Sequence, residues 1–178
     1  MFFRLLVFPL LMMSPLFADQ INLEVESVSN FELDRYLGTW YELTRMDHSF
    51  ERGMSHVTAT YSLDKKGRVE VLNRGYVKKK SKWKEARGHA KFKNSTSTGA
   101  FKVTFFWPFY GGYHIVELAE DYTYALVAGD SEKYLWILSR TPQLPEETWA
   151  KLLQRARSLG YDTDALIMVD HEPLPENP

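Results

Sequence analysis

The side chains that carry chemistry are scattered, and few stand at the spacings that reactions or metals require. The chain has five histidines and no cysteine, and the histidines show neither HExxH nor His-x-His spacing. His48 follows Asp47, a pair that is common by chance. Ser139 precedes Arg140 and does not lie in a nucleophile elbow. We therefore predict no catalytic centre, no metal and no cofactor, and the lack of cysteine excludes thiol catalysis, disulfides and cysteine-ligated zinc.

Composition places the chain among globular proteins of one domain. It has 178 residues, of which 44% are hydrophobic and 15% aromatic, with a formal net charge of -1. This length suffices to bury a real core, and the large side chains could line a cavity. The near-zero net charge gives no general attraction to nucleic acid, so we predict no nucleic-acid partner.

The first 18 residues have the pattern of a secretory signal peptide. A positive start at Met1–Arg4 precedes the apolar run Leu5–Met13, and small residues lead to Ala18 before Asp19. The run is shorter than the roughly 20 residues that span a bilayer. We predict cleavage after Ala18 and a domain over residues 19–170. Because no cysteine is available for a lipid anchor, we expect a soluble periplasmic protein.

Alternation of apolar and polar residues recurs along the chain and predicts half-buried strands. Turns such as 64–67, which contains Gly67, connect them. Regular short strands of this kind favour an all-β fold, and eight in up-and-down order form an antiparallel barrel that can hold one small ligand. The eight predicted strands are Trp40–Met46, Val57–Leu63, Val69–Val71, Lys84–Phe92, Phe101–Phe105, Tyr113–Ala119, Tyr124–Ala128 and Tyr134–Arg140.

The period changes after the last of these strands. Pro145 stands at a plausible first helical position and Gly160 at the end. We predict a helix with one apolar face packed outside the barrel, then a short strand at Ile167–Val169 and a loose tail over 171–178. The apolar residues at helical spacing are Trp149, Leu152, Leu153, Ala156 and Leu159.

Up-and-down order also sorts the connections between the two ends of the barrel. Those over 47–54, 77–82, 107–111 and 129–133 fall at one end and contain most of the loop aromatics. Those over 64–67, 93–98 and 120–121 fall at the other end. We predict that the first end is the mouth of the barrel.

Several segments in order resemble the lipocalin family, over about residues 31–169. Gly38-Thr39-Trp40-Tyr41-Glu42 resembles the first signature of that family, Asp121-Tyr122 part of the second, and Arg140 the third. Other segments resemble the bacterial lipocalins, whose members are typically outer-membrane lipoproteins anchored through a cysteine, which this chain lacks. These segments are Asp47-His48, Phe50 to Gly53, Val57 to Tyr61, Pro108 to Tyr113 and Tyr134 to Pro142.

The resemblance implies a calyx that binds fatty acids or lysophospholipids and serves lipid transport or membrane maintenance. It implies that Trp40 plugs the closed end with Arg140 packed over it, a structural role. It also implies peripheral contact with the outer membrane and a homodimer as candidate interactions. An enzyme acting on a lipid or another small hydrophobic substrate stays as the alternative function. An outer-membrane barrel is excluded because strands such as Lys84–Lys91 would expose charges to lipid.

Candidate ligand-binding residues come from the predicted mouth and walls. Lys78, Lys79 and Lys80 suit either a head group or a solvated loop, and we favour the loop. Trp107, Phe109 and Tyr110 suit a lid, a ligand contact, a dimer contact or internal packing. Wall residues serve equally as core or lining. Glu42 shares parity with Trp40, which suits an inward, buried carboxylate, and the role that we favour for it is hydrogen bonding near the closed end. The candidates are His48, Phe50, Arg52, Tyr61, Phe101, Val103, Phe105, Trp107, Phe109, Tyr110 and Tyr113.

Overall fold

A closed antiparallel barrel of eight strands forms the body of the molecule, as predicted. The computed structural model describes residues 25–174. The predicted signal peptide over residues 1–18 and the end of the predicted tail, residues 175–178, lie outside them. The strands of the barrel are β1 (Gly38–Arg45), β2 (Met54–Leu63), β3 (Val69–Val77), β4 (Lys82–Phe92), β5 (Ala100–Phe106), β6 (Phe109–Leu118), β7 (Tyr124–Ala128) and β8 (Leu135–Ser139).

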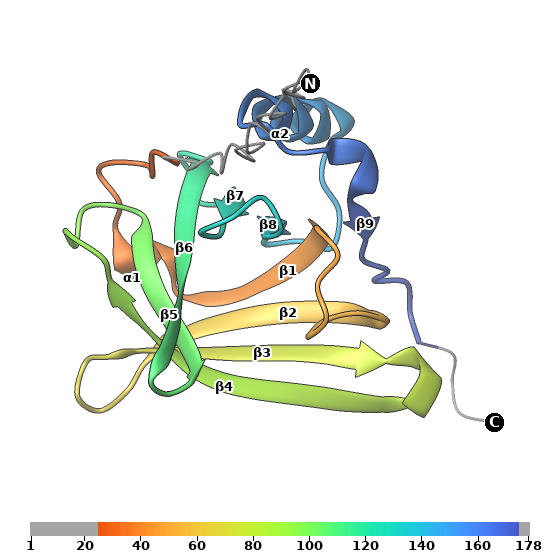
Figure 1. Cartoon of the computed structure of the whole chain (residues 1–178), viewed down its shortest axis with the longest axis horizontal. Coiled ribbons are helices and arrows are strands. Elements are labelled where there is room, and N and C mark those ends of the chain that lie inside the picture. The colour runs from red at the N-terminus through yellow and green to blue at the C-terminus, as the bar shows by residue number, and fades with distance from the viewer. Residues whose placement is uncertain (1–24, 175–178) are drawn as a thin grey trace, which may run out of the picture.

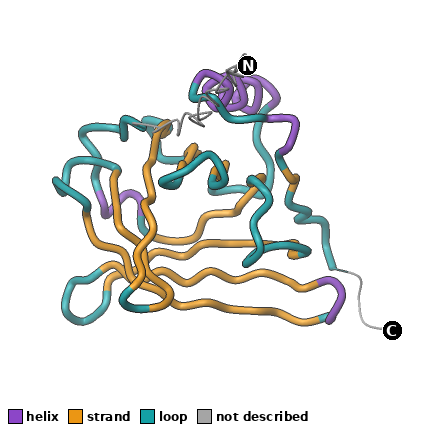
Figure 2. The backbone as a smooth tube through the Cα atoms, viewed as in Figure 1, coloured by secondary structure: helices purple, strands orange, loops and turns teal. Residues whose placement is uncertain are grey.

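Each strand pairs with the next along the chain, and β1 closes the barrel by pairing with both β2 and β8. The short strand β9 (Ile167–Met168) adds to the edge of β1 at Thr44 and Arg45. In Figure 1 the β5–β6 hairpin runs across the direction of β3 and β4 rather than alongside them. The same bend is visible in the backbone trace of Figure 2. The barrel is therefore strongly twisted, and its two halves face each other across an interior space.

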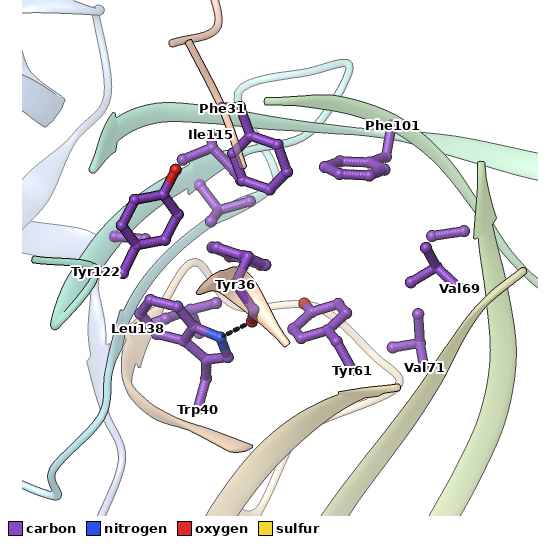
Figure 3. Packing of buried hydrophobic residues seen from close by; sticks show 13 residues of the cluster. Phe31, Tyr36, Trp40, Tyr61, Val69, Val71, Phe101, Ile115, Tyr122 and Leu138 are labelled. Carbon is purple, nitrogen blue, oxygen red and sulfur yellow. Dashed lines mark hydrogen bonds between the residues drawn. The ribbon is translucent and has the colours of Figure 1, made fainter. Parts of the chain in front are cut away.

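The inner face of the barrel carries an aromatic cluster at one end. Phe31, which precedes the short helix α1 (Leu33–Tyr36), reaches into this cluster together with Tyr36 itself. Figure 3 shows these two rings grouped with Trp40, Tyr61 and Phe101. Each of the five side chains is at most 6% exposed. The strands thus close at this end over a solid floor.

The helix α2 (Glu146–Ser158) covers the outer face of the barrel, as its single apolar stripe predicts. Leu152 and Ala156 are fully buried against outward residues of the sheet such as Leu126 and Ile137. Figure 1 shows the helix lying over β7 and β8. Among residues 25–174, no helix has the length and apolar character to span a membrane.

Some element boundaries differ from the sequence predictions. The connection predicted over 107–111 is shorter, because β6 begins at Phe109. The strand predicted at Val69–Val71 extends to Val77, since Asn73 and Gly75 at its inward positions interrupt the apolar alternation. Pro145 is the N-cap residue rather than the first helical residue, because α2 begins at Glu146. Helix α1 and a 3-10 turn, η1 (Lys78–Lys80), were not predicted.

Candidate ligand-binding site

The barrel encloses a cavity of about 410 Å³ that opens at the predicted mouth. This volume lies within the range of small-molecule sites. Its walls come from the inward positions of the strands, and its rim from the connections β1–β2, β5–β6 and β7–β8. The lining residues are mostly apolar or aromatic; they include Phe50, Val57, Ala59, Tyr61, Val71, Val103, Phe105, Phe106, Phe109, Tyr110, Tyr113, Tyr134, Trp136 and Leu138.

Three tyrosines join the floor of the cavity to its lower wall. The Tyr61 hydroxyl donates to the Tyr113 hydroxyl at 2.8 Å, and the Tyr113 and Tyr36 hydroxyls are 2.6 Å apart. Burial is the main cause that raises the pKa of each phenol; Tyr61 raises the pKa of Tyr36 further, and Tyr36 and Tyr61 together raise that of Tyr113. All three are therefore neutral at physiological pH. The floor offers hydroxyl groups but no charge.

Trp40 and Arg140 close the barrel beneath these tyrosines. The indole is fully buried, its Nε1 donates to the Tyr36 carbonyl at 2.8 Å, and the Arg140 guanidinium lies 3.8 Å from the ring centroid. The guanidinium also donates to the carbonyls of Arg35, Leu37, Thr39 and Tyr122. Arg140 thus ties α1, β1 and the β6–β7 turn together, and it lies over Trp40, where the family resemblance implies it.

Gly38 is required where β1 begins. Its φ is +95°, a backbone conformation that residues with a side chain rarely adopt, and an added Cβ would stand 3.4 Å from Nη1 of Arg140. The glycine of the signature therefore lets the chain turn sharply under the guanidinium.

An acidic group forms one wall of the cavity above the floor. Glu42 from β1 and Glu51 from the β1–β2 connection both line the cavity and are almost fully buried. Nη1 of Arg45 donates to Glu42 at 2.8 Å, and Nη2 donates to the Glu51 carbonyl at 2.8 Å. Nε1 of Trp136 donates to the Glu51 carboxyl at 3.3 Å, and Nε2 of His48 lies 3.1 Å from it. These contacts fold the β1–β2 connection back over the barrel.

Burial raises the pKa of the Glu42 carboxyl well above its usual range, and the nearby Glu51 raises it further against the opposing effect of Arg45. Glu42 points inward, as its parity with Trp40 predicts. Its hydrogen-bond partner is Arg45, whose guanidinium also donates to the β1–β2 connection at the mouth of the barrel. The hydrogen bond that Glu42 accepts from this arginine thus links β1 to the open end.

Comparison with known proteins agrees with this geometry. A family model described as a lipocalin-like domain matches residues 31–171. The chain belongs to the lipocalin family. It is 50% identical over 149 residues to the outer membrane lipoprotein Blc of Vibrio cholerae, covering 83% of this chain and 87% of that protein. It is 47% identical over 145 residues to Blc of Escherichia coli K12, covering 82% of each.

Solved lipocalin structures share the barrel. Insecticyanin from the tobacco hornworm Manduca sexta superimposes with a TM-score of 0.67 at 19% identity, covering 84% of this chain and 85% of that one. The cockroach allergen Per a 4 gives 0.65 at 25% identity, covering 82% and 91%. Membership of this family, together with the enclosed apolar cavity, supports a role in binding a hydrophobic ligand.

The lipocalin cavity gathers most of the predicted ligand residues but not all of them. His48 is buried behind the wall, where it stacks on Phe50 at 3.9 Å between ring centroids. Arg52 is exposed and paired with Asp47 at 2.8 Å. Phe101 packs in the floor cluster, and Trp107 lies at the tip of the β5–β6 hairpin; neither lines the cavity. The predicted residues that do line it are Phe50, Tyr61, Val103, Phe105, Phe109, Tyr110 and Tyr113.

Other lining residues of this lipocalin were not predicted. Asn73 and Trp136 share the inward face with Val71 and Leu138, so strand parity alone could have found them. Glu51 gave no such signal, because it lies in a connection. The tail residue His171 was predicted to be loose, but its Nε2 donates to the Glu42 carbonyl at 2.8 Å, on the backbone of the acidic wall.

Proposed function

We propose that this lipocalin binds single-chain acyl lipids, fatty acids or lysophospholipids, and stores or carries them in the bacterial envelope. The observation that supports this most is the cavity itself, whose exposed lining is largely apolar from the floor tyrosines to the mouth. A hydrocarbon chain is the ligand part that such a lining accepts without leaving buried polar groups unpaired.

The energetics of an acyl chain fit this proposal. Each buried methylene contributes about 0.8 kcal/mol, so a tail of ~14 methylenes contributes on the order of 11 kcal/mol before association costs of roughly 4 to 15 kcal/mol. At the low end of that cost the tail alone leaves about 7 kcal/mol, which corresponds to a Kd of roughly 10 μM, and this binding needs no catalytic group. We therefore propose a carrier rather than an enzyme.

The acidic wall gives the ligand a direction. A lipid that entered head first would place its carboxylate or phosphate beside Glu42 and Glu51. The cation next to them, Arg45, already donates to the Glu42 carboxyl and to the Glu51 carbonyl. Burying an unpaired anion is strongly unfavourable. The tail should therefore lie against the floor and the polar head at the mouth.

The test is binding to protein stripped of lipid by unfolding, washing and refolding. A fluorescent fatty acid is titrated into the protein, then displaced with palmitate, 1-palmitoyl lysophosphatidylglycerol and dodecane-diol as a polar-ended control. Saturable micromolar binding with displacement by the first two supports the proposal. No saturable binding by protein whose circular dichroism shows a folded barrel would refute it.

We also propose that the protein works at the surface of an envelope membrane. Relatives named as outer membrane lipoproteins place that group at the envelope. The β5–β6 tip exposes three large aromatics, with Phe106 at 80%, Trp107 at 82% and Phe109 at 77%. Aromatic side chains of this kind favour the interface between water and lipid. Lys91 on β4 and Lys102 on β5 stand opposite each other in the register of these two strands.

Vesicle flotation tests this contact. Vesicles of phosphatidylethanolamine with phosphatidylglycerol should carry the protein upward, and Trp107→Ser should reduce the floated fraction severalfold. A floated fraction that is the same for both proteins would contradict the contact. Concentration-dependent self-association lost in Trp107→Ser would instead assign the tip to a homodimer.

A further inference from the structure

The barrel wall has an open seam between β4 and β5. Their ladder covers only His89–Phe92 paired with Phe101–Thr104, so the rest of β4, Lys82–Gly88, has no partner on that edge. At Gly88 the strands are in tight contact, since an added Cβ would stand 2.4 Å from the Thr104 carbonyl oxygen. Beyond this point they diverge, as the crossing of β4 and β5 in Figure 1 shows.

A second cavity of about 530 Å³ occupies this seam. It shares lining residues with the central cavity, among them Glu51, Val57, Asn73 and Phe105. The two spaces therefore adjoin, and a ligand in the barrel can extend sideways into the seam.

Strand parity places one cation on the inner side of the seam. The β3–β4 register is continuous and pairs Gly75 with Lys84 and Val69 with Ala90. Because Val69 and Ala90 are buried in the inner core, Lys84 faces the same way, and it lines the seam cavity. Lys84 makes no ion pair with any of the described residues.

The other cations near the seam lie on the outer face of the same strands. Arg74 stacks over the Trp83 ring at 4.1 Å and lies 3.8 Å from Glu85, and Arg87 lies 3.5 Å from the same carboxyl. Both guanidinium groups and the Glu85 carboxyl also line the seam cavity, and the two arginines share that one carboxylate. Among the described residues, Lys84 is the cation lining the seam that has no carboxylate partner.

A polar atom without a partner lies where the two cavities meet. Asn73 lines both of them, and its Oδ1 is buried with no hydrogen-bond partner among the described residues. A buried acceptor of this kind is unfavourable unless a ligand or water donates to it. A hydroxyl group on the ligand would satisfy it.

Resting on the proposed function, we propose that the seam is the head-group subsite for a single-chain glycerophospholipid. The acyl tail fills the barrel, the glycerol hydroxyl donates to Oδ1 of Asn73, and the phosphate lies against the Lys84 ammonium. The head group leaves the barrel sideways between β4 and β5. Glu51 lines both cavities and Glu42 lines the central one, so a phosphate deeper than the seam would meet both carboxyls.

Three ligands with the same palmitoyl tail separate the two contacts. Palmitate carries the negative charge without a glycerol hydroxyl, monopalmitoylglycerol carries hydroxyls without the charge, and 1-palmitoyl lysophosphatidylglycerol carries both. Lys84→Ala should weaken lysophosphatidylglycerol roughly threefold to tenfold, weaken palmitate less because its carboxylate ends the chain one glycerol unit before the phosphate, and leave monopalmitoylglycerol unchanged. Asn73→Ala should weaken the two glycerol lipids by a similar factor and leave palmitate unchanged.

Lys79→Ala is the matched control, because Lys79 belongs to η1 at the same end of the barrel and lines neither cavity. Lys84→Glu should weaken the anionic ligands more than Lys84→Ala, and raised salt should narrow the difference. Equal affinities of wild type, Lys84→Ala and Lys84→Glu for lysophosphatidylglycerol would overturn the subsite. A wild-type protein that binds none of the three ligands would instead refute the proposed function.

Discussion

Truncation of Trp40 tests whether the floor holds the barrel together. Trp→Ala in a core destabilises by roughly 3 to 5 kcal/mol, and here the change also removes the stacking of Arg140 at 3.8 Å and the hydrogen bond to the Tyr36 carbonyl. The stacking alone contributes about 0.5 to 2 kcal/mol. We therefore expect Trp40→Ala to lower the free energy of unfolding by ~5 kcal/mol, the upper end of that range.

For a domain of this size, a loss of ~5 kcal/mol lowers Tm by roughly 10 to 20 °C. Thermal and urea unfolding followed by far-ultraviolet circular dichroism measure the loss without relying on tryptophan fluorescence. Trp40→Phe keeps an aromatic ring over Tyr36 and should lose about half as much. Trp83→Ala is the control, because Trp83 is 41% exposed, and it should change Tm by only a few degrees. A Tm of Trp40→Ala within about 3 °C of wild type would refute the plug.

Three further changes test other parts of the structure. Burial, with a further contribution from Glu51, raises the pKa of Glu42, so the wild-type protein loses stability as pH rises from the unfolded value of 4.5 through the folded one. Glu42→Gln lacks this loss, so its stability relative to wild type should be greater at pH 8 than at pH 5; equal pH dependence of the unfolding free energies of the two proteins would contradict the raised pKa. Gly38→Ala should lose about 1 to 3 kcal/mol because φ is +95°, whereas Gly111→Ala, with open space around its Cβ position, should lose far less. Val103→Trp should fill the cavity and weaken fatty-acid binding at least tenfold in displacement assays, and unchanged affinity in a folded variant would show that the ligand lies elsewhere.

Much of the fold could be predicted from the sequence because strand periodicity is local. Alternation in Val57–Leu63 and the short apolar run Tyr124–Ala128 each indicate a strand, and the order of turns then places the mouth. The end of β3 was missed because Asn73, Arg74 and Gly75 are poor strand formers that the barrel nevertheless pairs with β4.

The site was less predictable because its polar groups meet across the barrel. The contact between Glu51 and Trp136 joins residues 85 positions apart, and no local pattern indicates that a connection folds back over the cavity. The position of Lys84 illustrates the same limit. Its parity could be read from the strand, but the seam that exposes it depends on where β4 separates from β5 at Gly88.

Native mass spectrometry of protein prepared without detergent from an exporting bacterium measures the central claim most directly. We predict one single-chain lipid bound per protein chain, released on activation as a fatty acid or lysophospholipid mass, and a reduced bound fraction in Val103→Trp. Protein that is folded yet carries no lipid, and gains none when incubated with lysophosphatidylglycerol, would contradict the account.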